Sequence, residues 1–192
     1  MNILNVGYDS TNYYILADTR PKLLVDAGWP RSLGRLQNEC KRYDIQLKDI
    51  PYMIVTHFHP DHAGLVQELK DLGMYLLIVD IQKPFIPELK KHMKPRDEYV
   101  EIDLRDNTVI TLEQSRRFLA KLGVQGELIA TPGHSDDSIS LILDEGVAFT
   151  GDLTHPRLLI DPADPCHRSW DKLRSRHVKT VYGGHGPSWQ LQ

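Results

Sequence analysis

The sequence predicts a single domain of the α+β class, in which helices cover the faces of layered β-sheets. With 192 residues, the chain is long enough for one substantial core and too short for two ordinary domains. Predicted strands and helices are mixed along its whole length, and such elements bury their apolar faces by packing in layers. No internal repeat, low-complexity segment or linker-like tract divides the chain, so residues 1–192 are expected to form one domain.

The predicted strands are short runs rich in β-branched and aromatic residues between turn signals. They cover 12–16, 23–25, 53–55, 76–79, 128–130, 139–143, 147–150 and 178–182. Four helices are predicted, the first two from apolar residues at three- and four-residue steps. They run from Pro30, where Leu33, Leu36, Cys40 and Tyr43 recur, over 61–72, over 111–122, and from about Trp170. Gly73 is placed to stop the second helix, and Thr111 with Gln114 has capping-box spacing. Segment 81–106 is less regular, and its prolines and lysines favour a short helix between loops.

Composition and charge exclude several classes of protein. The apolar content of 41% and charged content of 26% are typical of a globular domain. A net charge of −3 without a basic stripe makes a nucleic-acid partner unexpected. No secretory signal or membrane-spanning run is found, and Cys40 and Cys166 are too few for a disulfide framework. We therefore expect a cytoplasmic protein without membrane association that acts on a small-molecule substrate, with a homodimer left open.

Four segments share one design, in which a predicted strand ends in a tight loop that carries metal-capable side chains. These side chains are His57, His59, Asp61 and His62, then His134, Asp152 and His185. Strand ends are where layered α/β folds collect binding groups, and the flanking glycines allow sharp turns. A lone loop histidine is usually a solvated polar residue, but His57 and His59 at two-residue spacing point the same way and can bind one ion. Asp61 and His62 begin the next helix and can bind a second ion.

The donor types of these loops suit particular metals. Five imidazoles and two carboxylates without a thiolate favour zinc, manganese or iron, and they disfavour a structural thiolate site. The sequence therefore predicts a site for two divalent metal ions, with Zn²⁺ preferred and Mn²⁺ or Fe²⁺ as alternatives.

The string His57-Phe58-His59-Pro60-Asp61-His62 resembles the signature of the metallo-β-lactamase superfamily. The family's Val-Asp-Ala-Gly motif lies upstream at 25–28. Its other motifs follow in the family's order as Thr-Pro-Gly-His at 131–134, Thr-Gly-Asp at 150–152 and Gly-His-Gly-Pro at 184–187. This resemblance implies a four-layer αββα sandwich with the metals at one edge. It assigns His57, His59 and His134 to the first metal, Asp61, His62 and His185 to the second, and Asp152 to both as the bridging ligand. Asp26 is either a supporting residue beneath the site, as is usual in the family, or a turn residue before Gly28.

The resemblance implies a binuclear metal-dependent hydrolase in which a bridging hydroxide attacks an ester, lactone or thioester bond. The ligand pattern is similar to the glyoxalase II-like and lactonase-like branches. However, a helical extension after His185 is not expected, and the Tyr that lactonases carry after the bridging residue is missing from Asp152-Leu153-Thr154-His155. Antibiotic hydrolysis is not expected, because the best-known β-lactamases have Cys at the position of Asp152.

Two side chains are candidates for catalysis in addition to metal binding. Asp61 can relay a proton to the leaving group. His155 follows Asp152 by three residues, and its imidazole can donate a hydrogen bond or a proton near neutral pH. The alternative for His155 is a surface histidine before Pro156.

Other functions remain open at this point. An iron-dependent persulfide dioxygenase and a phosphodiesterase share the family's fold, although the full second ligand set disfavours the former and the lack of a basic surface disfavours RNA as a substrate. The same ligand set argues against a binding protein without metals.

Further polar and aromatic residues are expected to be incidental to the site. Cys166 and His167 are placed in a Pro-rich loop, and His92 and His177 on the solvated surface. Lys90, Lys91, Lys94 and Arg96 form an exposed face or, alternatively, a lid over the site. Trp29, Trp170 and Trp189 are expected to pack, although Trp29 can also rim the pocket.

Overall fold

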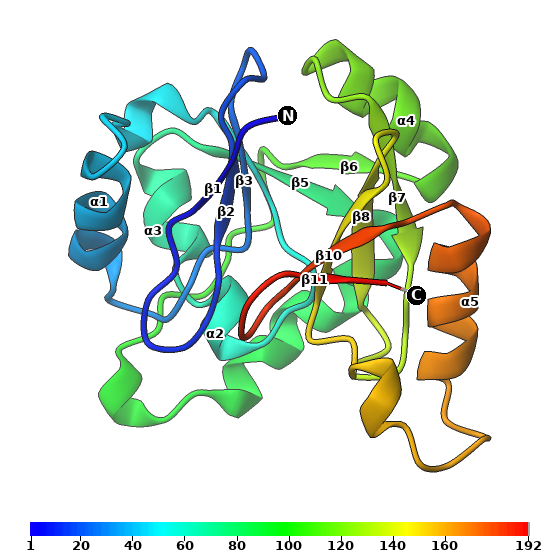
Figure 1. The fold of residues 1–192 in the computed structure, drawn as a ribbon. Helices are drawn as coiled ribbons and strands as arrows, with labels where there is room; N and C mark the ends of the chain where they lie inside the picture. Colours follow the sequence, from blue (N-terminus) through cyan, green and yellow to red (C-terminus); the bar gives the residue numbers. More distant parts are fainter. Residues whose placement is uncertain (192) are drawn as a thin grey trace.

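The computed structural model describes residues 1–191 and contains two β-sheets that face each other (Figure 1). The first sheet has the order β1-β2-β3-β4-β5-β6, and its strands are Ile3–Asn5, Tyr14–Leu16, Leu23–Val25, Tyr52–Ile54, Tyr75–Val79 and Thr108–Ile110. The second has the order β11-β10-β9-β8-β7, and β7 to β11 are Gly126–Ala130, Ile139–Leu143, Val147–Gly151, Thr180–Gly183 and Trp189–Gln190. Strands β3 to β6 are parallel, as are β9 and β10, so their loops emerge at shared edges.

Helices cover the outer faces of both sheets, and further helices lie at the edge of the sandwich or pack against the cluster between the sheets. They are α1 (Leu33–Lys41), α2 (Pro60–Ala63), α3 (Val66–Asp71), α4 (Leu112–Lys121) and α5 (Cys166–Ser175), with 3₁₀ segments η1 (Leu47–Asp49), η2 (Asp80–His92), η3 (Pro95–Asp97) and η4 (Pro156–Leu158). Figure 1 shows α1 and α3 beside one sheet and α5 beside the other. The layer order of helix, sheet, sheet and helix confirms the expected αββα sandwich.

Alternation along the strands explains how the layers are joined. Met53 of β4 packs in a cluster with residues of α1 and α3, whereas the next residue, Ile54, packs between the two sheets. Successive side chains of a strand point to opposite faces, so a fully apolar strand such as β5 supplies both clusters. A third cluster joins the outer face of the second sheet to α5 through Trp170 and Leu173. Both sheets are therefore held on two sides, and the loops at their edges have firm supports.

Most predicted elements are present, with shifted ends. The helix expected over 111–122 is α4, and Thr111 and Gln114 form the expected capping box. The helix expected from Pro30 begins only at Leu33, and Tyr43, expected on its apolar face, is 41% exposed. The last helix begins at Cys166 rather than near Trp170. Strands β1, β6 and β11 were not predicted.

The helix predicted over 61–72 is wrong as a continuous element. The chain forms α2 and α3 with a break at Gly64 and Leu65. The cause is tertiary, because Gly64 lies so close to Pro30 that a Cβ there would be 2.3 Å from its Cδ. Leu65 N–H donates to Gly28 O at 2.9 Å, which replaces the helical hydrogen bond. In segment 81–106, the expected short helix is the 3₁₀ segment η2. None of the helices within residues 1–191 is long and apolar enough to cross a bilayer.

Candidate metal centre

The seven predicted ligand residues meet at one edge of the sandwich, although they come from four separate loops. These loops follow β4, β7, β9 and β10, and α2 carries two of the residues. The side chains form two groups, and within each group the ligand atoms lie within 4.8 Å of one another. One group is His57, His59 and His134, and the other is Asp61, His62, Asp152 and His185. The structure thus brings together all seven residues, and their roles as ligands stay predictions.

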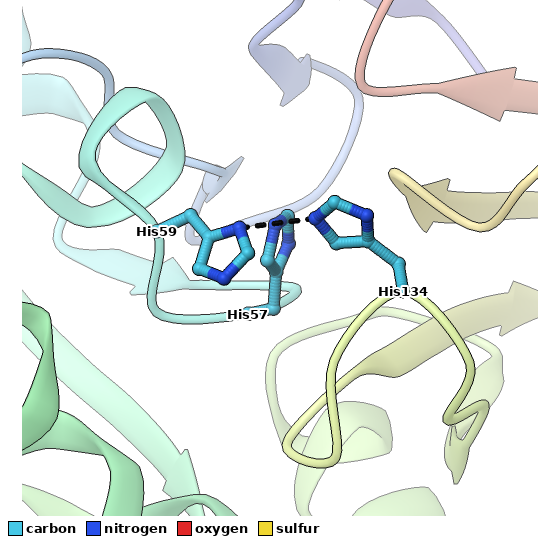
Figure 2. Close-up of side chains that lie close together, drawn as sticks. All are labelled: His57, His59 and His134. Carbon is cyan, nitrogen blue, oxygen red and sulfur yellow. Dashed lines mark hydrogen bonds between the residues drawn. The ribbon is translucent and has the colours of Figure 1, made fainter. Parts of the chain in front are cut away.

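The first group consists of three imidazoles (Figure 2). His59 Nδ1 lies 3.0 Å from His134 Nε2, and the ring of His57 lies 4.5 Å and 4.8 Å from the other two ring centres. Burial, followed by the neighbouring His62, holds the pKa of His57 well below its usual value. Burial and then His134 likewise lower the pKa of His59. Both rings are therefore neutral at pH 7, which is the protonation state that binds a metal.

The second group contains two carboxylates between two imidazoles. His185 Nε2 lies 3.4 Å from Asp61 Oδ2 and 3.3 Å from Asp152 Oδ2, and His62 Nε2 lies 3.1 Å from Asp152 Oδ1. Asp152 Oδ2 is also 3.6 Å from His134 Nε2 in the first group. Asp152 therefore lies between the groups, where a bridging ligand would have to be.

His62 and Asp152 influence each other's protonation in the metal-free protein. Burial disfavours a charge on His62, but Asp26 and Asp152 outweigh it and raise the pKa of His62 to about 10. Burial alone would raise the pKa of the Asp152 carboxyl, but the adjacent imidazole of His62, 3.1 Å away, holds this pKa well below its usual range. The second group is therefore a carboxylate beside a protonated imidazole until a cation replaces the proton.

Three buried polar atoms that lack a hydrogen-bond partner in the described part of the chain indicate that a metal ion fits this arrangement. His57 Nε2, His62 Nε2 and Asp152 Oδ1 have no hydrogen-bond partner of good geometry among residues 1–191. Leaving a buried polar atom unpaired costs about 1–3 kcal/mol, so a cluster of them indicates a missing partner. Gly184 leaves room beside them, since a Cβ there would lie 2.3 Å from Asp152 Oδ1. The imidazole and carboxylate donors fit divalent ions such as zinc.

Asp26 supports the second group from beneath. Its carboxylate is buried, accepts hydrogen bonds from Thr56 N and Oγ1, and lies 2.9 Å from His62 Nδ1. A hydrogen bond at Nδ1 fixes the ring so that Nε2 faces the site, as outer partners of metal-binding histidines usually do. Asp26 also has a φ of 65° in the turn before Gly28. Asp26 is therefore both a supporting residue beneath the site and a turn residue before Gly28.

Supporting residues that the sequence analysis missed hold the loop of the first group. Asp137 is buried, and its Oδ2 accepts the backbone N–H of Phe58, which lies between His57 and His59, at 2.7 Å. The buried Gln82 donates from Nε2 to the Asp137 carbonyl and to Val55 O. These contacts join residues that are 27 to 79 positions apart in the sequence. No local pattern marks them, apart from the position of Asp137 shortly after His134.

Two polar groups from the loop before β2 complete the second group. Thr11 Oγ1 donates to Asp61 Oδ2 at 3.1 Å, and His185 Nδ1 lies 2.7 Å from Ser10 O. The carbonyl can only accept, so His185 carries a proton on Nδ1 and presents Nε2 to the carboxylates. Asp61 and His185 are thereby oriented by a segment that carries no predicted ligand.

His155 is not in either ligand group. It lines a cavity of about 580 Å³ together with Asp152 and His185. Its Nδ1 accepts the N–H of Arg157 at 3.1 Å, and its ring lies 4.2 Å from that of Trp189. Its catalytic role stays a prediction. A larger cavity, of about 720 Å³, lies beside α1 and η1 and contains no residue of either ligand group.

The remaining candidates lie mostly outside the site. Cys166 and His167 are in the first turn of α5, so their placement in a Pro-rich loop is wrong. His177 is exposed as expected, whereas the exposed His92 has its ring 5.4 Å from that of His59. Trp170 is buried, and the 39% exposed Trp29 lines a different cavity.

The lysine-rich segment forms an exposed face that is anchored to the core. Lys90 and Lys91 are exposed and pair with Glu101 and Glu88. Ile86 and Leu89 of the same segment are buried in the cluster beneath the first sheet. This packing favours the exposed-face interpretation over a lid.

Sequence and structure comparisons with known proteins all find similarity to the same superfamily. The model of the metallo-beta-lactamase superfamily matches residues 6–185. A beta-lactamase-like protein 2 homolog from Caenorhabditis elegans is 30% identical over 184 residues, covering 92% of this chain and 56% of that protein. An atrochrysone carboxyl ACP thioesterase from Claviceps purpurea is 28% identical over 185 residues, covering 93% and 52%. The chain therefore spans about half the length of these curated relatives. A metallo-beta-lactamase family protein of known structure from Thermus thermophilus superposes with a TM-score of 0.77 at 21% identity, covering 98% of this chain and 74% of that one.

Proposed function

Because the chain belongs to the metallo-β-lactamase superfamily, we propose that it is a hydrolase that uses two divalent metal ions, preferably zinc. The observation that carries this proposal is the pair of adjacent donor groups with Asp152 between them. All seven residues would hold the ions, with three imidazoles for the first and with Asp61, His62 and His185 for the second. Bound there, the ions would activate a water at neutral pH and polarise the bond to be cleaved.

The chain's own residues would bind, orient and move protons. Asp61 accepts a hydrogen bond from Thr11 and has its Oδ2 directed at His185, so it can take a proton and return it to the leaving group. In the neutral form of His155, Nδ1 accepts the backbone N–H of Arg157, so the ring proton is on Nε2. That proton is available to a substrate oxygen in the cavity.

We propose a small-molecule ester, lactone or thioester as the substrate. The thioesterase name of the Claviceps purpurea relative supports this class, as does a donor set suited to polarising a carbonyl. The full second group disfavours a persulfide dioxygenase, whose chemistry needs one iron.

Metal analysis and a substrate panel test the proposal together. Protein purified without chelator should contain about two equivalents of zinc, manganese or iron. The loaded protein should cleave one of the ester, lactone or thioester substrates faster than phosphodiesters or β-lactams. One tightly bound iron with persulfide-dependent oxygen uptake would contradict the hydrolase assignment.

A further inference from the structure

The cavity beside Asp152 and His185 has two chemically different walls. Its volume is about 580 Å³. One wall contains the predicted ligands His134, Asp152 and His185. The rest of its lining includes an apolar wall, formed by Leu153, Leu158, Trp170, Pro187 and Trp189. A substrate whose scissile bond lies at the ligands can therefore place an adjoining part of itself against the apolar wall.

The apolar wall is preformed. The ring of Trp189 packs against that of the buried Trp170, with ring centres 5.4 Å apart. The centre of the His155 ring lies 4.2 Å from that of Trp189. Leu158 is 69% exposed in the protein alone, so it offers apolar area that a bound group could cover. Covering such area is favourable in proportion to the surface removed from water. Rigid aromatic walls add to this, because they lose little conformational freedom when a ligand binds.

Within residues 1–191, the lining of the same cavity contains no lysine or arginine that could pair with an anionic group on the adjoining part of a substrate. In the same range of the chain, His155 is its one ionisable side chain outside the ligand groups. Moving a carboxylate or phosphate from water into this space without a partner is unfavourable.

We infer that the substrate carries an uncharged, apolar arm, alkyl or aryl, which packs between Leu158, Pro187 and Trp189 while the ester, lactone or thioester bond lies at the metals. This inference rests on the proposed function and narrows its substrate class. It excludes substrates whose arm ends in a carboxylate or phosphate close to the scissile bond.

Two series of substrates test the arm on the metal-loaded protein. One consists of thioesters of N-acetylcysteamine from acetyl to hexanoyl, and the other of acetate esters of alcohols from methanol to hexanol. A fully buried methylene is worth about fourfold in affinity, so kcat/KM should rise at least about tenfold along one series. The adipoyl thioester, with a carboxylate at the end of the arm, should be at least about tenfold poorer than hexanoyl. Flat series, or a preference for adipoyl, would overturn the inference.

Leu158 and Ile160 provide matched variants in one loop. Leu158 lines the cavity, whereas Ile160 does not and is 94% exposed. Leu158→Gln should reduce the hexanoyl-to-acetyl ratio of kcat/KM by about threefold or more, and Ile160→Gln should leave the ratio unchanged. Equal effects of both variants would show that the arm does not contact this wall.

Binding of 1-octanol separates this inference from the proposed function. In NMR titrations, octanol should shift the methyl signals of Leu158 and the indole signal of Trp189, but not those of Ile160 and Trp29. If these shifts occur while the panel finds no turnover, the apolar site stands and the hydrolase proposal fails. If esters are cleaved but octanol causes no such shifts and the series are flat, the hydrolase proposal stands and this inference fails.

Discussion

Nδ1 of His62 lies 2.9 Å from Oδ2 of Asp26, and both side chains are buried. This contact stabilises the protonated imidazole and is one reason why the pKa of His62 is raised to about 10. The same contact also orients Nε2 toward the second ligand group. His62 must lose its proton before that nitrogen can bind an ion, so Asp26 both positions the ligand and favours the proton that competes with the metal.

We expect metal binding at the second group to release about one proton at pH 7–8. His62 is protonated below a pKa of about 10 in the metal-free protein, whereas His57 and His59 are already neutral. Affinity at the second group should therefore rise up to about tenfold per pH unit toward pH 10, and affinity at the first group should change less. Calorimetry in buffers of different ionisation enthalpy measures the protons released.

Asp26→Asn provides the check on this mechanism. It removes the charge that raises the pKa of His62, so fewer protons should be released at pH 8. Proton release identical to that of the wild type would show that Asp26 does not control His62.

Replacement of Asp152 and of His185 should separate the two ligand groups. Asp152 lies within 4 Å of imidazole nitrogens in both groups, so Asp152→Ala should lower the occupancy of both ions and abolish activity. His185→Ala should mainly lower the occupancy of the second ion. Elemental analysis after dialysis measures both. Unchanged metal content and turnover in His185→Ala would remove this residue from the ligand set.

His155→Ala should distinguish a catalytic donor from a ligand and from a surface residue. His155 lines the cavity but belongs to neither ligand group. We expect the variant to keep both ions and to lose about a hundredfold in kcat, as is typical when a proton donor is removed. Loss of metal would identify a ligand, and unchanged kcat would leave a surface role.

Gly184→Ala should damage the site without changing any ligand. The new Cβ would lie 2.3 Å from Asp152 Oδ1 and 2.6 Å from His62 Cε1. Displacing these groups should weaken the second ion and destabilise the fold by about 1–3 kcal/mol, as overpacking commonly does. The matched control is Gly34→Ala in α1, where a Cβ has no neighbour within 4 Å. That control should keep both ions and gain up to about 1 kcal/mol in helix stability. Metal content and thermal unfolding measure the difference.

The candidate ligands could be predicted from sequence because their signals are local. His57 to His62 form a continuous string, and the others follow predicted strands beside glycine or proline. Strands β1, β6 and β11 could not. Their positions are partly or fully exposed for the most part, so they lack the continuous buried apolar run of the similarly short β2 and β3. Val109 of β6 is even 44% exposed.

Tertiary contacts account for the other differences. The break between α2 and α3 depends on the contact of Gly64 with Pro30, which no helical periodicity records. The support of the first group by Asp137 joins residues 79 apart in sequence. Such contacts depend on the assembled sandwich, so a window of neighbouring residues does not contain them.

The division of the ligands between the two sheets has a consequence for assembly. His57 and His59 follow the first sheet's β4, whereas their partner His134 follows β7 of the second sheet. The second group likewise joins α2, next to β4, to loops of β9 and β10. Each ion would thus link the two halves of the molecule, which are the two sheets with their loops. Neither half alone offers a complete set of donors. Metal binding would then require that the two halves are already packed together. Removal of the metals by a chelator would weaken the contact between the two halves before either half unfolds.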